Sequence, residues 1–144
     1  MNPSVQSVPG NGAVILANPD ASTGLVNVSL ITDATKIGLT WQTGAASGCT
    51  PVIDYRLSWD QGTNSYLVIG IGITTTSYTT IISLTPGTVY KFKVESRNAF
   101  GYSSTYSSDI AVRAAKVSDA PTSLPKNVAV TASGVIGLIW SAGT

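Results

Sequence analysis

The stretch that decides the fold is residues 84–95, which read Leu-Thr-Pro-Gly-Thr-Val-Tyr-Lys-Phe-Lys-Val-Glu. From residue 88 onward the side chains alternate in the period-two pattern of a strand with one buried face. The face expected to be buried carries Thr88, Tyr90, Phe92 and Val94. The face expected in water carries Val89, Lys91, Lys93 and Glu95. Pro86 and Gly87 favour a turn before this strand, because proline has no amide to donate and glycine adopts turn conformations readily.

Six further strands are expected around this one. They are segments rich in alternating or β-branched residues, most of them separated by clusters of Gly, Asn, Asp, Pro or Ser. The seven predicted strands cover residues 25–31, 36–42, 52–59, 66–72, 77–82, 88–97 and 105–115. No window has the 3.6-residue period of a helix. Seven short strands in succession predict an all-β fold, an antiparallel sandwich.

The chain also repeats itself at an offset of 99 residues. Ile-Gly-Leu-Thr-Trp at 37–41 recurs as Ile-Gly-Leu-Ile-Trp at 136–140, and 10 of 25 residues between 20 and 44 are identical at that offset. A period this long indicates a tandem array of domains, because solenoid repeats are about 20–50 residues long. We expect three parts: residues 1–19, the closing strand and linker of a preceding repeat; 20–118, one complete repeat; and 119–144, the first two strands of the next.

The pattern around the central strand resembles the signature of the fibronectin type III family. The matching motif is Leu84-x-Pro86-x-Thr88-x-Tyr90-x-Phe92-x-Val94, followed by Asn98, Gly101 and Ser103. Trp41 and Tyr55 stand where that family places a tryptophan in strand B and a tyrosine in strand C. The resemblance covers residues 20–118, and residues 119–144 as far as they extend.

This resemblance implies an immunoglobulin-like Greek-key sandwich. Its expected core is Trp41, Tyr55, Leu84, Tyr90, Phe92 and Val94. Tyr90 would form the tyrosine corner of the family, with its hydroxyl bonded to backbone near Leu84. The resemblance also implies an extracellular, non-catalytic module that occurs in tandem arrays as a spacer, an adhesive surface or a receptor ectodomain.

Composition excludes several classes of function. The sequence has no His, one Cys and one Glu, so it offers no His-based catalysis, zinc site or internal disulfide. We expect Glu95 to face water, and Asp54 and Asp60 to be solvated carboxylates, so no enzyme, cofactor or metal is predicted. A formal net charge of +1 gives no basic field for a nucleic acid. No segment reaches the roughly 20 apolar residues of a membrane-spanning helix.

Three features are candidates for modification or bonding. Asn27 begins the sequon Asn-Val-Ser and is the glycosylation candidate. The hydroxyl-rich loops at 74–76 and 103–108 are candidates for O-linked sugars, with plain hydrated hydroxyls as the alternative. Cys49 is either paired with another repeat or chain, a free thiol, or a half-buried small residue without a bond.

Residues 66–73 are apolar on both faces and would form strand C′, at a sheet edge. Proteins usually protect such edges with charge, so a lateral contact is expected there, the alternative being cover by the domain itself. The lateral-contact candidates are Leu67, Ile69, Ile71 and Ile73. In the loop between strands F and G, Phe100 and Tyr102 are either exposed anchors for a partner or packed on their own sheet.

Two functions remain open. The first is a structural or adhesive segment of a long extracellular or cell-surface protein, assembled with further copies into a filament or surface coat. Its partners would be neighbouring repeats of the polypeptide, further copies of itself, and glycans. The second is an accessory spacer or binding module of a large secreted enzyme or receptor.

Overall fold

The computed structural model describes residues 12, 15–116, 120–121, 125 and 127–141. This part of the chain forms strands and turns, and no helix in it is long and apolar enough to cross a membrane. The strands in chain order are β1 (Thr23–Asn27), β2 (Gly38–Gln42), β3 (Asp54–Trp59), β4 (Leu67–Ile73), β5 (Ser77–Thr79), β6 (Val89–Arg97) and β7 (Ile110–Arg113).

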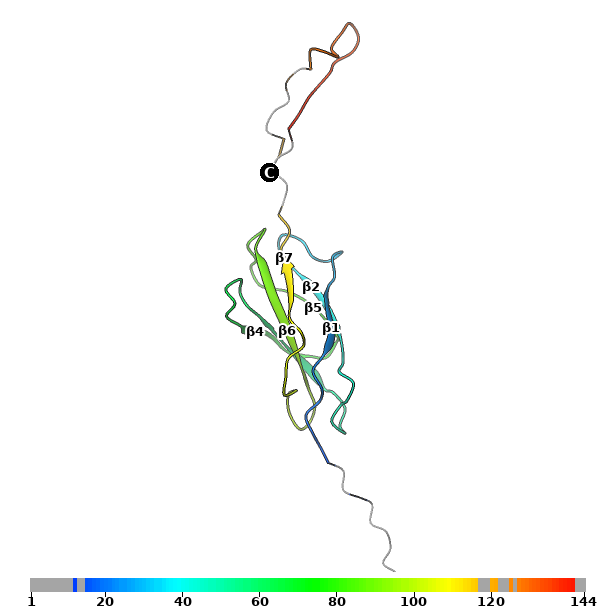
Figure 1. The fold of residues 1–144 in the computed structure, drawn as a ribbon, viewed down its shortest axis with the longest axis vertical. Helices are drawn as coiled ribbons and strands as arrows, with labels where there is room; N and C mark the ends of the chain where they lie inside the picture. The colour runs from blue at the N-terminus through cyan, green and yellow to red at the C-terminus, as the bar shows by residue number, and fades with distance from the viewer. Residues whose placement is uncertain (1–11, 13–14, 117–119, 122–124, 126, 142–144) are drawn as a thin grey trace, which may run out of the picture.

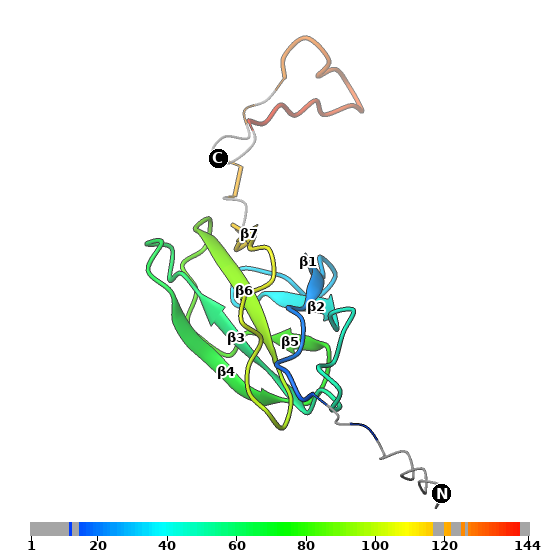
Figure 2. The ribbon, with the colours of Figure 1, turned by 60° about the horizontal axis from the view of Figure 1, so that its bottom comes forward.

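The strands form two antiparallel sheets that pack as a sandwich (Figures 1 and 2). One sheet has the order β1-β2-β5 and the other β4-β3-β6-β7, so the chain crosses three times between the sheets, after β2, after β4 and after β5. The expected all-β Greek-key sandwich is confirmed. The last strand is much shorter than the predicted 105–115, because Ser103 and Ser107 bond the backbone of β6 from an irregular loop.

The core between the sheets comes mainly from alternate residues of β2, β3 and β6. Its buried members are Ile37, Leu39, Trp41, Tyr55, Leu57, Tyr90, Phe92, Val94, Val112 and Ala114. Trp41 meets Tyr55 edge to face with ring centroids 5.5 Å apart, and Trp59 stacks on Tyr90 at 5.3 Å. Leu84 differs from its prediction and is only partly buried, because it lies in the loop after β5, at one end of the sandwich.

Tyr90 also fixes the turn that precedes β6. The backbone amide of Thr85 donates a hydrogen bond of 2.8 Å to the Tyr90 hydroxyl, in the corner geometry that the resemblance implied. The amide of Gly87 donates to the carbonyl of Ala114 at 2.8 Å. The turn is therefore tied both to the core and to the segment that leaves β7.

Residues just before Asp20 contact the central domain. The amide of Ala17 donates to the carbonyl of Gly48 (3.1 Å), and the side chain of Asn98 donates to the carbonyl of Ala17 (2.7 Å). Pro19 is buried. Ala17, in the segment expected to be linker, is thus bonded to the β2–β3 loop and to the residue that follows β6.

The loop between β1 and β2 has a compact hydrogen-bonded form. The amide of Val28 donates to the carbonyl of Gly38 (2.8 Å), and the amide of Gly38 donates to the hydroxyl of Thr32 (3.0 Å). These bonds fold residues 28–37 back on themselves at the end of the sandwich where β7 finishes (Figure 1).

The described residues 127–141 contain the same arrangement. The amide of Asn127 donates to the carbonyl of Gly137 (2.8 Å), and the amide of Gly137 donates to the hydroxyl of Thr131 (3.0 Å). Each partner lies 99 positions after its counterpart in the first loop. In Figures 1 and 2 this segment lies outside the sandwich, past the end of β7.

Candidate interaction surfaces

Two ion pairs lie on the outer face of the four-stranded sheet. The register of β3 and β6 sets Asp54 opposite Arg97 and Arg56 opposite Glu95. Arg56 binds Glu95 with two hydrogen bonds, Nε to Oε2 at 2.6 Å and Nη2 to Oε1 at 2.7 Å. Arg97 binds Asp54 through Nε to Oδ1 at 2.7 Å and through Nη2 to Oδ2. Both are bidentate pairs, which fix the two side chains in position.

The carboxylates predicted to be solvated are buried instead. Glu95 and Asp54 lie under their arginine partners, whose stems cover this face of the sheet. Asp60 is buried at the end of β3, where it accepts hydrogen bonds from the amides of Gly62 (2.9 Å) and Lys91 (2.8 Å). Strand alternation correctly puts Glu95 on the outer face, but that face is not open to water at this point.

The ion pairs shift the titration of their members. The hydrogen bond from Arg97 holds the pKa of Asp54 below its usual value, in spite of burial. The same bond raises the pKa of Arg97, and the bond to Glu95 raises the pKa of Arg56. All three groups are therefore charged at neutral pH.

Tyr102 lies against the two arginines of these ion pairs. The guanidinium of Arg56 lies 4.0 Å from the centroid of the Tyr102 ring, and that of Arg97 lies 5.6 Å from it. Cations at these distances are attracted by the electron-rich ring face. Tyr102 therefore packs on its own sheet, whereas Phe100, two residues earlier, is 62% exposed.

Lys93 is held between two further tyrosine rings. Its Nζ lies 3.6 Å from the centroid of Tyr106 and 4.1 Å from that of Tyr66. The Tyr66 hydroxyl donates a hydrogen bond of 3.4 Å to Asp109. Burial is the main cause of a raised Tyr66 pKa, and the charge of Asp109 adds to it.

We call this surface the Arg–Tyr face, made of Asp54, Arg56, Tyr66, Lys93, Glu95, Arg97, Tyr102 and Tyr106. Arg and Tyr are enriched in protein interfaces, which makes it a candidate surface for a protein partner.

Sequence reasoning missed the Arg–Tyr face. Its residues come from β3, β6 and two loops, and only the register between strands brings them together. The available signal was the alternation of charge on β6, where Lys93, Glu95 and Arg97 follow one another on one face.

The edge strand β4 does not alternate because its pairing with β3 is interrupted twice. In each register shift β4 has one residue more than β3, first between Val68 and Gly70 and then between Gly70 and Ile73. Gly72, in the second shift, has a φ of 65°, a left-handed conformation that suits glycine. These irregularities decide which apolar side chains point inward.

The four lateral-contact candidates are consequently divided. Ile69 and Ile73 pack against the core, so they are not available to a partner. Leu67 is exposed and Ile71 is 71% exposed. A lateral contact through β4 would therefore rest on Leu67 and Ile71, together with the exposed Val68.

The candidates for modification lie in different surroundings. Asn27 is partly buried at the end of β1, where its side-chain oxygen accepts a hydrogen bond from the Thr32 hydroxyl. Cys49 is exposed in the loop between β2 and β3. Of the hydroxyl-rich loops, residues 74–76 are exposed. In the loop 103–108, Ser103 and Ser107 are buried, whereas Ser104, Thr105 and Ser108 are exposed.

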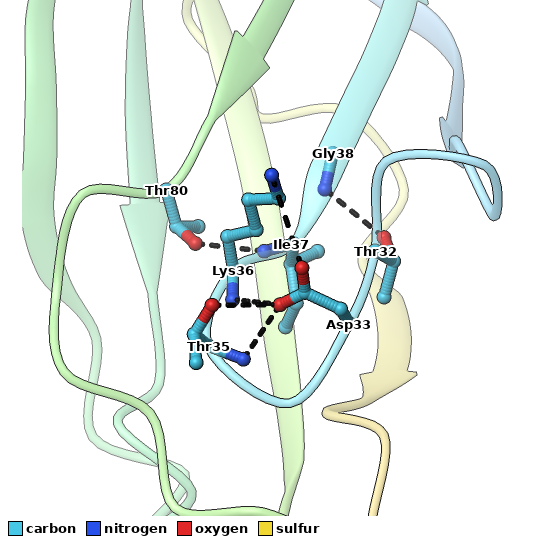
Figure 3. A network of polar contacts seen from close by, with 7 residues as sticks. All are labelled: Thr32, Asp33, Thr35, Lys36, Ile37, Gly38 and Thr80. Atoms are coloured by element: carbon cyan, nitrogen blue, oxygen red, sulfur yellow. Dashed lines mark hydrogen bonds and ion pairs between the residues drawn. The ribbon is translucent and has the colours of Figure 1, made fainter.

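A polar network organises the loop between β1 and β2 (Figure 3). One carboxylate oxygen of Asp33 accepts from the Thr35 amide (2.7 Å), the Thr35 hydroxyl (2.8 Å) and the Lys36 amide (3.0 Å). The bond from the Thr35 amide is the main cause of a lowered Asp33 pKa. The Ile37 amide donates to Thr80 at 2.8 Å and so joins this loop to the one after β5. An Asp followed two positions later by Thr is the sequence signal of such a turn.

An open pocket lies beside this network at the end of the domain. Its volume is about 420 Å³, and it is lined by Thr35, Thr80, Ile81, Ile82, Ser83 and Leu84. Within the described residues there is no group of three or more Cys, Asp or Glu side chains that could hold a metal ion.

Comparison with known proteins gives relatives of the same fold. The family model for the fibronectin type III domain matches residues 22–113, while no curated protein matches the chain significantly. Titin domains A168–A170 are 25% identical, with 69% of this chain and 33% of that chain covered and a TM-score of 0.62. The titin kinase with its flanking domains is 26% identical, with 65% and 17% covered and a TM-score of 0.54. The sixth fibronectin type III domain from human fibronectin type III domain containing protein 3 is 24% identical, with 79% and 99% covered and a TM-score of 0.59.

The chain spans a third or less of the two titin segments, so the similarity concerns one domain of each. The matched residues 22–113 make up more than half of the chain and include all seven strands. The chain therefore belongs to the fibronectin type III family.

Proposed function

We propose that this chain is part of a tandem array of fibronectin type III repeats and serves as a non-catalytic structural or adhesive segment of an extracellular protein, such as a filament or surface coat. The observation that carries the proposal is the recurrence of the β1–β2 loop at residues 127–137. Backbone bonds and the Thr hydroxyl bond recur there at the same offset as the sequence identities.

The two glycines of the repeated Ile-Gly-Leu motif support this interpretation. A Cβ on Gly38 would lie 2.7 Å from the Cβ of Ile31, and a Cβ on Gly137 would lie 2.1 Å from Cγ2 of Val130. Ile31 and Val130 are again 99 positions apart. Both copies thus need glycine for the same reason, which is the close approach of the folded loop.

A structural role agrees with the state of the acidic side chains. The carboxylates of Asp54 and Glu95 accept hydrogen bonds from arginines, and the carboxylate of Asp60 accepts hydrogen bonds from backbone amides. Each carboxylate therefore stabilises the sandwich. Domains of this family are generally non-catalytic and serve as structural or binding modules.

The extracellular part of the proposal rests on the surface chemistry. A quarter of the residues are Ser or Thr, and only 10% are charged. Such a composition suits attachment of sugars at Asn27 and at residues 74–76, which would keep a repeat array of low charge hydrated.

A second function is favoured by one comparison. The titin kinase structure contains domains of this fold beside a catalytic domain. A chain of the same fold can therefore act as an accessory module of a larger enzyme or receptor, with the catalytic part elsewhere in the polypeptide.

Sequencing the parent transcript distinguishes the two functions. The array predicts further copies of the motif Leu-x-Pro-x-Thr-x-Tyr-x-Phe-x-Val, the first of them about 99 residues after Leu84. A catalytic domain within one or two repeats would instead support the accessory module.

Labelling of intact cells tests the location. A membrane-impermeant amine reagent should modify Lys36, whose side chain is partly exposed, without lysis. Labelling that requires lysis would contradict an extracellular position. Treatment with an enzyme that removes N-linked sugars should then shift the mass of the peptide that contains Asn27, and an unchanged mass would exclude that site.

A further inference from the structure

We infer that the end of the central domain around the pocket is a docking surface for the following repeat, and that consecutive repeats contact each other directly without a flexible linker. The inference rests on the proposed tandem array and adds to it the surface through which neighbours are joined.

Several large apolar side chains at this end of the domain are exposed. Leu30, at the tip of the β1–β2 loop, is 98% exposed, and Ile81, at the mouth of the pocket, is 88% exposed. Ile31 is also exposed. Ile81 lines the pocket, and Leu30 and Ile31 belong to the loop that contributes Thr35 to it. Exposed large apolar side chains at one end of a domain are typical of a site that another surface covers.

The chain leaves the domain at this same end. The amide of Ala115 donates to the carbonyl of Asp33 at 3.1 Å, and Asp33 belongs to the turn that contributes Thr35 to the pocket. The polypeptide that follows Ala115 therefore starts beside the apolar surface.

The repeat period leaves no room for a spacer. Backbone hydrogen bonds join Ala17 to the central domain at its N-terminal end and Ala115 to it at the other end, and residues 17–115 span 99 positions, which equals the repeat period. The counterpart of Ala17 in the following repeat is thus Lys116, the residue directly after Ala115. Because adjacent Cα atoms are about 3.8 Å apart, two repeats joined in this way must touch.

The opposite end of the domain offers a matching surface. There Phe100 is 62% exposed and Ile53 is also exposed, close to the loops that hold Ala17. In the following repeat the equivalents of Phe100 and Ile53 would face Leu30 and Ile81 of the repeat before it. Apolar contact between these surfaces would fix the angle between neighbours.

The test uses the whole 144-residue chain extended by a copy of its residues 46–118. This extension completes a second repeat in the correct period, because residues 119–144 correspond to residues 20–45. The second repeat keeps the counterparts of Leu25, Ile37, Leu39 and Trp41, which are identical. The readout is the relaxation of side-chain methyl groups by a soluble gadolinium chelate, measured by NMR.

Extension should abolish most of the relaxation enhancement at the methyls of Leu30 and Ile81. The methyls of Ile71, 71% exposed on β4, serve as the control and should keep theirs. Insertion of Gly-Ser-Gly-Ser between Ala115 and Lys116 should restore the enhancement at Leu30 and Ile81. Replacing Phe100 by Ser in the second repeat alone should restore part of it.

A folded second repeat that leaves Leu30 and Ile81 as accessible as in the 144-residue chain would overturn the inference but not the array. A second repeat that remains unfolded, both with its own first strands and with residues 20–118 copied in full, would overturn the tandem array and this inference with it.

Discussion

Arg97 on β6 binds Asp54 on β3, the neighbouring central strand of the four-stranded sheet, with Nε and Nη2 each donating to a different carboxylate oxygen. Asp54 is buried, whereas the arginine side chain remains partly exposed. A second ion pair, Arg56–Glu95, lies beside it on the outer face of the same two strands. Charge pairing of this kind is measurable as a pH-dependent stability.

Replacing Asp54 by Asn should lower the free energy of unfolding by about 1–2 kcal/mol at pH 7, because charge-assisted bonds to a partly exposed arginine are lost. The folded-state pKa of Asp54 lies below its unfolded value of about 3.9. The stabilisation is therefore present above that value and is lost as the pH falls through the folded pKa. Urea unfolding at pH 7 and pH 3 should show a smaller difference between variant and wild type at pH 3.

The control for this experiment is Asp109→Asn. Asp109 is exposed, and its one described bond is a long one from Tyr66. Its substitution should change stability by less than about 0.5 kcal/mol. A difference for Asp54→Asn that stays constant with pH would contradict the role given to its charge.

Tyr90→Phe should cost about 1–2 kcal/mol, because the amide of Thr85 loses its acceptor while the ring stays in the core. Tyr106→Phe is the matched control, since Tyr106 is exposed and contacts Lys93 through its ring rather than its hydroxyl. Thermal unfolding followed by circular dichroism measures both. Equal effects of the two substitutions would argue against the corner hydrogen bond.

Trp41→Ala should remove about 3–5 kcal/mol of stability, enough to unfold a marginal domain. Trp140, its counterpart 99 residues later, is 63% exposed. Trp140→Ala should therefore leave the unfolding transition of the same chain unchanged. Chemical denaturation monitored by far-ultraviolet circular dichroism compares the two, and a comparable loss for Trp140→Ala would mean that residues 127–141 pack on the core.

Gly38→Ala should cost about 1–3 kcal/mol, because the added Cβ would overlap the side chain of Ile31. In a double-mutant cycle, Ile31→Ala should offset little of this cost, since its own Cβ remains. Ile31→Gly should offset more, because it removes the atom at 2.7 Å. Additive effects of Gly38→Ala and Ile31→Gly would show that the glycine is required for another reason.

On β4, Ile69→Lys should destabilise the domain by more than about 2 kcal/mol, because a charge would enter the core. Ile71→Lys should have almost no effect on folding. If copies associate laterally through this edge, Ile71→Lys should also reduce self-association in analytical ultracentrifugation. Self-association unchanged by Ile71→Lys would exclude β4 as the contact.

The strands were predictable because their signal is local. Alternation around Tyr90 and Phe92 identifies the buried face of β6 without knowledge of any neighbour. The burial of Asp54 was not predictable in this way, since it depends on Arg97, 43 positions later in the chain. Burial on an outer sheet face is set by what lies opposite in the register, and the register is a tertiary property.

The candidate surfaces follow the same division. Residue composition marked β4 as an unusual edge, but the inward turn of Ile69 and Ile73 comes from two extra residues that appear only in the pairing with β3. The exposure of Ile81 was not predicted, because the sequence pattern predicts a strand over residues 77–82. In the structure β5 ends at Thr79, so Ile81 lies in the loop that follows. Local patterns therefore located the elements, and the surfaces between elements required the structure.

The irregular pairing of β4 with β3 affects how easily this strand can pair with the wrong domain during folding. Similar domains on one chain experience a high effective concentration of each other, which favours exchange of strands between them during folding. A regular edge would offer a neighbour an unbroken row of amides and carbonyls, whereas the two shifts along β4 break that row. In the proposed tandem array, these irregularities would hinder the exchange of β4 with a strand of a neighbouring repeat.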